Sequence, residues 1–189
     1  MTKNIAAAIL AGGKASRLGG LAKGNILRSN GLTIIEHLLA EFDKVGIHDV
    51  IIVSKNPAYQ RYNKPMIADK RQNIGPLAGI EAALSYYRSN YHATLFLPCD
   101  MPNFSENEMR VLLDKFQGKD TVFAVTGDED WHPLCAVVNN DWLDDISKLI
   151  DAGNRSIKDV WLKCRGKPIF FSNNMAFANI NTIGDALAF

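Results

Sequence analysis

The stretch Ile5-Ala-Ala-Ala-Ile-Leu10, followed at once by Ala-Gly-Gly-Lys-Ala-Ser-Arg-Leu-Gly-Gly-Leu-Ala-Lys23, decides the fold that this sequence predicts. Its first six residues are all apolar, without the alternation of a strand that has one solvated face. Such a run is typical of a strand covered on both faces, as in a parallel sheet. We therefore expect a buried strand over 5–10 that delivers a loop rich in glycine and basic residues.

Further strands and helices alternate along the chain. The apolar runs predict strands at 49–54, 66–69, 93–97, 121–126, 134–138 and 169–172, with a polar loop at 127–130. Helices are expected to open at the capping boxes 33–36 and 105–108 and with Pro76 at the first helical position, and further helices over 142–150, over 155–163 and from Thr182. This order predicts a single α/β domain over 1–189, a three-layer, doubly wound, Rossmann-like fold around a mostly parallel but mixed sheet.

Composition excludes several classes of partner. Of 189 residues, 47% are hydrophobic and 22% are charged, which is typical of a globular protein, and the net charge of +1 provides no surface for nucleic acid or an anionic membrane. No apolar run approaches the length of a membrane helix. Cys99, Cys135 and Cys164 lack the spacing of a metal site, so we expect reduced thiols and a cytoplasmic protein.

The loop after the first strand has the composition of a phosphate-binding loop. Its glycines would let backbone N–H groups approach a ligand, and Arg17 and Lys23 would neutralise a polyphosphate. It matches neither the P-loop nor the GxGxxG pattern of dinucleotide-binding proteins. On composition alone, a solvated loop without a ligand stays open as the alternative.

Asp100 is the strongest single candidate for chemistry. It follows the predicted strand 93–97 and stands between Pro98 and Pro102, which restrict the backbone on both sides. Ligands of doubly wound sheets bind beyond the carboxyl ends of the strands, where this loop is expected. The alternative is that Asp100 only caps its own turn.

Leu10–Lys23 resembles the signature loop of the nucleotidyltransferase family related to the MobA guanylyltransferases of the molybdenum cofactor, roughly LAGG-x-x-x-R-(M/L)-GG-x-D-K. The match fails at Ala22, where that family usually has Asp. The resemblance continues, in order, through the motifs at 75–79, 98–102, 132–134, 153–156 and 179–182, so it covers nearly the whole chain.

This resemblance implies transfer of GMP from GTP to the terminal phosphate of Mo-molybdopterin, with release of pyrophosphate and Mg²⁺ as the cofactor. The catalytic residues it implies are Arg17, Lys23 and Asp100, with Asp100 as the metal ligand. The nucleotide-binding residues it implies are Leu10, Ala11, Gly12, Gly13, Lys23, Asp69, Gly75 and Asp100. At the pterin end it implies Arg155, Asn179 and Asn181. Where the family often places an Asn against the base, this sequence has Ser54, with Asn56 two residues later.

Other functions compete with this one. A cytidylyltransferase acting on the same pterin is the nearest, although that branch more often has LAAG where this chain has Gly12. A sugar-phosphate nucleotidyltransferase, a nucleotide sensor without catalysis and an NAD-dependent oxidoreductase fit less well. The expected partners are the two small substrates and, transiently, cofactor-biosynthesis proteins or acceptor molybdoenzymes, with no nucleic acid and no membrane.

Overall fold

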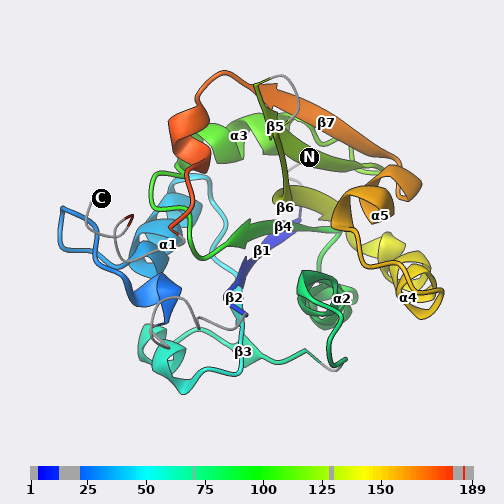
Figure 1. The fold of residues 1–189 in the computed structure, drawn as a ribbon, viewed down its shortest axis with the longest axis horizontal. Helices are drawn as coiled ribbons and strands as arrows, with labels where there is room; N and C mark the ends of the chain where they lie inside the picture. The colour runs from blue at the N-terminus through cyan, green and yellow to red at the C-terminus, as the bar shows by residue number, and fades with distance from the viewer. Residues whose placement is uncertain (1–3, 13–21, 70, 128–129, 181–184, 186–189) are drawn as a thin grey trace.

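A computed structural model of the protein describes residues 4–12, 22–69, 71–127, 130–180 and 185, and these contain one seven-stranded sheet of order β3-β2-β1-β4-β6-β5-β7 (Figure 1). The strands are β1 (Ile5–Leu10), β2 (Val50–Val53), β3 (Met66–Ile67), β4 (Ala93–Pro98), β5 (Thr121–Thr126), β6 (Asp130–Asn139) and β7 (Gly166–Phe171). β6 is antiparallel to both of its neighbours, and all other pairs are parallel. The predicted mostly parallel, mixed sheet is confirmed.

Helices cover both faces of the sheet. Figure 1 shows α1 (Ile34–Lys44) and α3 (Glu106–Lys115) on one face, and α2 (Pro76–Tyr87), α4 (Leu143–Asp151) and α5 (Ile157–Lys163) on the other. Each face has its own cluster of buried apolar side chains. The three-layer, Rossmann-like α/β fold is thereby confirmed. Among the described residues, no helix has both the length and the apolar character needed to cross a membrane.

The first strand shows why its sequence is apolar throughout. Ala7 and Ile9 belong to the cluster that packs under α1 and α3, whereas Ala6 and Ala8 belong to the cluster under α2. All six residues of β1 are buried, because alternate side chains of a strand point to opposite faces and both faces are covered here.

Two helices begin where the sequence predicts them. The Thr33 side chain accepts a hydrogen bond from the backbone N–H of Glu36, whose carboxylate accepts one from the N–H of Thr33. Ser105 and Glu108 form the same capping box at the start of α3. These reciprocal bonds satisfy backbone donors that a helix N-terminus leaves unpaired.

Several predicted boundaries are wrong. The strand expected at 134–138 begins at Asp130, because Asp130, Trp131 and His132 pair with β5 beyond a register shift at Phe123/Ala124. β7 begins at Gly166, three residues early, and follows β5 in parallel. β3 is shorter than expected, and α5 begins at Ile157. The predicted helix start at Thr182 lies outside the described residues.

Short 3-10 helices complete the connections, and the sequence patterns did not predict them. They are η2 (Lys23–Asn25), η3 (Pro57–Tyr62), η4 (Asn140–Trp142) and η5 (Asn174–Phe177). The first two lie after β1 and β2 and contact each other. They therefore belong to the edge of the sheet where β1, β2 and β4 end.

Candidate active site

A cavity of about 910 Å³ opens at the carboxyl ends of β1, β2 and β4. Parallel strands deliver their following loops to the same edge of a sheet, which is where ligands of open α/β sheets bind. The residues that line the cavity are Leu10, Ala11, Gly12, Ala22, Lys23, Val53, Ser54, Lys55, Asn56, Tyr59, Asp69, Arg71, Gln72, Asn73, Ile74, Gly75, Pro76, Gly79, Pro98, Cys99, Asp100 and Leu134.

Lys23 and Asp100 meet in this cavity. The Nζ atom of Lys23 donates to Oδ2 of Asp100 over 2.9 Å, although 77 positions separate the two residues in the sequence. Their side chains are 25% and 20% exposed, so both charges can reach a ligand while water screens them only in part. The fold thus places one cation and one carboxylate side by side at the end of β4, the arrangement on which any enzymatic assignment depends.

Backbone hydrogen bonds hold the strand ends around this pair. The Cys99 N–H donates to the carbonyl of Leu10, and the Ala11 N–H donates to the carbonyl of Val53. The buried Ser54 hydroxyl donates to the carbonyl of Ala11 over 3.0 Å and accepts from the N–H of Asn56. Ser54 therefore contacts the loop after β1, and its hydroxyl is committed to the backbone.

Asp69 and Gly75 form another part of the cavity wall. Gly75 precedes α2 with φ of 74° and ψ of −156°, a conformation that L side chains rarely adopt. Gly79, in the first turns of α2, lies so close to β2 that an added Cβ would stand 3.1 Å from Cγ1 of Val53 and 3.5 Å from Oδ1 of Asp69. Both glycines thereby allow the N-terminal end of α2, where backbone dipoles favour negative charge, to border the cavity.

Arg71 is a cavity residue that sequence reasoning missed. Its guanidinium donates through Nε and Nη2 to both oxygens of Glu81, over 2.6 and 2.8 Å, and through Nη1 to Asp151 on α4. These bonds raise the pKa of Arg71 and anchor the loop between β3 and α2 to two helices. No local motif marks this role, because both partners lie at a distance in the sequence.

Of the predicted site residues, seven line the cavity: Leu10, Ala11, Gly12, Lys23, Asp69, Gly75 and Asp100. Gly13, Arg17 and Asn181 lie outside the described residues. Arg155 and Asn179 are described, and neither is among the residues that line the cavity.

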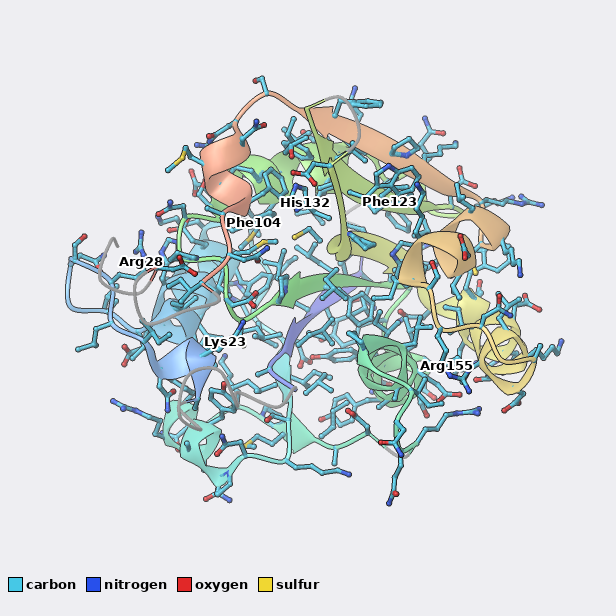
Figure 2. All side chains as sticks on the ribbon, in the orientation of Figure 1. Lys23, Arg28, Phe104, Phe123, His132 and Arg155 are labelled. Atoms are coloured by element: carbon cyan, nitrogen blue, oxygen red, sulfur yellow. The ribbon has the colours of Figure 1, made fainter. Side chains whose placement is uncertain are left out.

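Arg155 and Asn179 lie apart from each other. Figure 2 shows Arg155 beside α4, across α2 from Lys23. Its Nη1 donates to the carbonyls of Ile150 and Asn154, so the side chain covers the C-terminal end of α4. Asn179 is exposed, and the N–H of the next residue, Ile180, donates to the backbone carbonyl of Asp100. The C-terminal stretch thus reaches the Asp100 loop through its backbone.

The three cysteines are free and buried, as the sequence predicts for reduced thiols. Burial raises the pKa of the Cys99 thiol to about 12, with the neighbouring Asp100 charge acting in the same direction. A thiolate, and not a thiol, is the nucleophile of cysteine chemistry. Cys99 therefore contributes packing beneath the site and no nucleophile.

Metal binding by the protein alone is not supported by the described residues, since no three His, Cys, Asp or Glu side chains gather there as a metal cluster. Asp100 is a partly exposed carboxylate in the cavity and could supply one oxygen ligand. Mg²⁺ is usually held by one or two carboxylates together with substrate phosphates, so this donor set fits a metal that arrives with a nucleotide.

Comparison with known proteins identifies a family and several relatives that match most or nearly all of the chain. Residues 7–166 match the model of the MobA-like NTP transferase domain. A molybdenum cofactor guanylyltransferase from Haemophilus influenzae is 31% identical over 191 residues, covering 98% of this chain and 97% of that protein. One from Shewanella sp. (strain MR-4) is 30% identical over 187 residues, covering 96% and 93%.

A solved structure with the same fold comes from Archaeoglobus fulgidus. That protein, molybdopterin-guanine dinucleotide biosynthesis protein A, superposes with a TM-score of 0.73 at 22% identity and covers 96% of this chain and 95% of its own. At this identity the likeness supports the fold alone.

Proposed function

The chain belongs to the MobA-like NTP transferase family, and from this premise we propose that it is a molybdenum cofactor guanylyltransferase. The reaction transfers GMP from GTP to the terminal phosphate of Mo-molybdopterin and releases pyrophosphate. The curated relatives that carry this name match over nearly the full length of both chains, so the proposal concerns the whole protein.

One observation carries the proposal: the 2.9 Å pairing of Lys23 with Asp100 inside a cavity large enough for a nucleoside triphosphate. Attack by a phosphate that is already anionic needs no nucleophile from the protein. The protein's contribution is to align the reacting groups and to neutralise charge. Lys23 suits the second task, because a lysine ammonium beside phosphates offsets their negative charge.

The other predicted site residues have proposed roles of their own. The backbone from Leu10 to Gly13 binds the triphosphate, Arg17 acts with Lys23 on charge that develops on the leaving pyrophosphate, and Asp69 and Gly75 contact the nucleoside. Arg155, Asn179 and Asn181 bind the pterin substrate. Binding there requires Arg155 to exchange its contacts with the end of α4 for contacts with the substrate.

We include Mg²⁺ as the metal cofactor, held by Asp100 together with substrate phosphates. When bound, the metal supplies positive charge to the phosphates, which favours displacement at phosphorus. Lys23 and Asp100 lie side by side in the cavity. The ammonium group can therefore bind a phosphate while the carboxylate binds the metal.

The proposed partners are small molecules, with transient contacts to cofactor-biosynthesis proteins or acceptor molybdoenzymes. We propose a cytoplasmic location, which agrees with three free cysteines among the described residues.

The experiment that tests the function incubates the purified protein with Mo-molybdopterin, Mg²⁺ and each of the four nucleoside triphosphates in turn, and identifies the product by mass. We expect the guanine dinucleotide from GTP alone, and no pyrophosphate in excess chelator. Pyrophosphate release that persists in chelator would remove Asp100 as a metal ligand.

A cytidylyltransferase is the second candidate, and the same reactions separate the two. Thermal unfolding gives an independent reading, because a ligand that binds only the folded protein raises its melting temperature. With Mg²⁺ present, GTP should raise it more than CTP. A cytosine product, or a larger shift with CTP, would favour the second candidate.

A further inference from the structure

Tyr59 contacts Gly24 and Cys99, the residues next to Lys23 and Asp100 in the sequence. It belongs to η3, is only 2% exposed and contributes to the lining of the cavity. The sequence patterns gave it no role. Its hydroxyl oxygen accepts a hydrogen bond from the N–H of Gly24 over 3.3 Å and lies 4.0 Å from Sγ of Cys99.

The two neighbours of this hydroxyl are adjacent in sequence to the two charged residues. Gly24 directly follows Lys23, and Cys99 directly precedes Asp100. The phenol therefore contacts the backbone of the residue after Lys23 and the side chain of the residue before Asp100. Its bond to the Gly24 N–H is buried, in a region where an unpaired donor is costly.

Packing around Gly24 leaves little freedom at this junction. A Cβ at position 24 would stand 2.6 Å from Cδ1 and 2.7 Å from Cγ1 of Ile35, and 3.1 Å from Cε1 of Tyr59. The glycine is thus enclosed between α1 and the tyrosine ring. The backbone of η2 is closely packed at Gly24, so the Tyr59 hydroxyl bonds to a segment with few alternative positions.

Other hydrogen bonds of η3 hold it against η2 and the start of α1. The Tyr62 hydroxyl donates to the Asn25 side chain and lies 3.0 Å from the Thr33 hydroxyl, and the Asn25 amide donates to the carbonyl of Ala58. The Tyr59 hydroxyl differs from these groups, because it contacts η2 at Gly24 and also lies against Cys99 at the end of β4.

We propose that Tyr59 is a positioning residue, whose hydroxyl fixes the backbone of η2 relative to the end of β4 and so sets the separation of Lys23 from Asp100. This inference rests on the proposed nucleotidyl transfer, because the spacing of the two charges matters through the triphosphate that they bind. Tyr59 acts through its neighbours, and no contact of its hydroxyl with substrate is required.

The test compares Tyr59→Phe with Tyr87→Phe. Tyr87 is similarly buried, and its hydroxyl lies 3.2 Å from the carbonyl oxygens of both Ala7 and Asp49 and can donate to either, but it does not line the cavity. Both variants keep the ring and lose buried hydrogen bonds, so we expect similar decreases in melting temperature. In Tyr59→Phe, kcat for pyrophosphate release should fall about tenfold with the KM for GTP changed by about twofold or less, because misplacing catalytic groups affects the reacting state most. Tyr87→Phe should keep the wild-type kcat.

Hydrogen exchange provides a reading that does not depend on turnover. The amides of 23–25 should exchange faster in Tyr59→Phe than in Tyr87→Phe, since only the first variant removes the acceptor of the Gly24 N–H. Unchanged exchange at 23–25, or equal kcat in the two variants, would overturn the role of Tyr59. Absence of any transfer by the wild-type protein would instead refute the proposed function, while the exchange comparison would still decide whether the hydroxyl holds η2.

Discussion

The two halves of the sheet present their candidate residues differently. In the half formed by β1 to β4, the strands are parallel, and the segments after β1, β2 and β4 converge on one cavity with Lys23 and Asp100 at 2.9 Å. In the half formed by β5 to β7, strand direction reverses at β6, and neither Arg155 nor Asn179 lines that cavity. Parallel strands therefore bring the segments that follow them to one edge of the sheet, where these segments form a shared cavity. In the other half, the position of each candidate residue depends on the connection that carries it.

The largest expected effect comes from the charged pair of the first half. Asp100→Ala should lower kcat/KM about a thousandfold and Lys23→Ala about a hundredfold, the range seen when a group that stabilises the transition state is removed. Stability should change by less than about 1 kcal/mol, because partly exposed ion pairs contribute little. Steady-state pyrophosphate release and thermal unfolding measure the two effects. Wild-type turnover in either variant would remove that residue from the mechanism.

The next effect concerns the close packing beneath this pair. Gly24→Ala should destabilise the protein by about 1–3 kcal/mol, since the new Cβ overlaps the side chain of Ile35. Denaturant unfolding measures the cost. In an Ile35→Ala background, which removes both overlapping atoms, the same substitution should cost less. An equal cost in both backgrounds would show that crowding at Ile35 is not the cause.

A smaller effect tests the second half. If Arg155 binds the pterin substrate, Arg155→Ala should raise the KM for Mo-molybdopterin about tenfold, the loss of one charge-assisted hydrogen bond, and leave the KM for GTP unchanged. Arg88→Ala is the matched control, because Arg88 is an exposed arginine paired with Asp144. A lowered melting temperature with unchanged KM values would limit Arg155 to its contacts with the end of α4.

The smallest effect is a pH dependence to which each half contributes one histidine. Burial lowers the pKa of His37, which is bonded to the carbonyl of Phe104, and of His132, which is bonded to Thr126. The unfolded chain therefore takes up protons first as the pH falls below about 6.5, and the free energy of unfolding decreases between about pH 6.5 and 5. Denaturant unfolding at pH 7 and 5.5 measures this.

Two variants assign the pH dependence to its sources. His37→Gln and His132→Gln should each reduce the difference in unfolding free energy between pH 7 and 5.5. Carboxyl groups with lowered pKa values, such as Glu36 and Glu41, lose their contribution at lower pH and stay outside this window. A difference that stays at its wild-type size in both variants would contradict the assignment.

Much of the parallel half could be predicted from sequence, because its signals are local. Continuous apolar runs predicted β1 and β2, capping boxes predicted α1 and α3, and the rule for strand ends led to Asp69 and Asp100. Asn56-Pro57 marks the start of the 3-10 helix that carries Tyr59, but Tyr59 itself was missed. Its hydroxyl contacts residues that are distant in the sequence, and no local pattern shows such contacts. The start of β6 was missed because pairing with β5, and not hydrophobicity, makes Asp130 a strand residue.

The hydrogen bond from the Ile180 N–H to the Asp100 carbonyl can form only late in the synthesis of the chain. Lys23 and Asp100 leave the ribosome early, but the acid's loop acquires this last backbone partner only after both β5 and β7 have been made. At about 5–20 residues per second, several seconds pass between the synthesis of Asp100 and the synthesis of Ile180. The Asp100 loop therefore acquires this hydrogen bond only after nearly all of the described chain has been made.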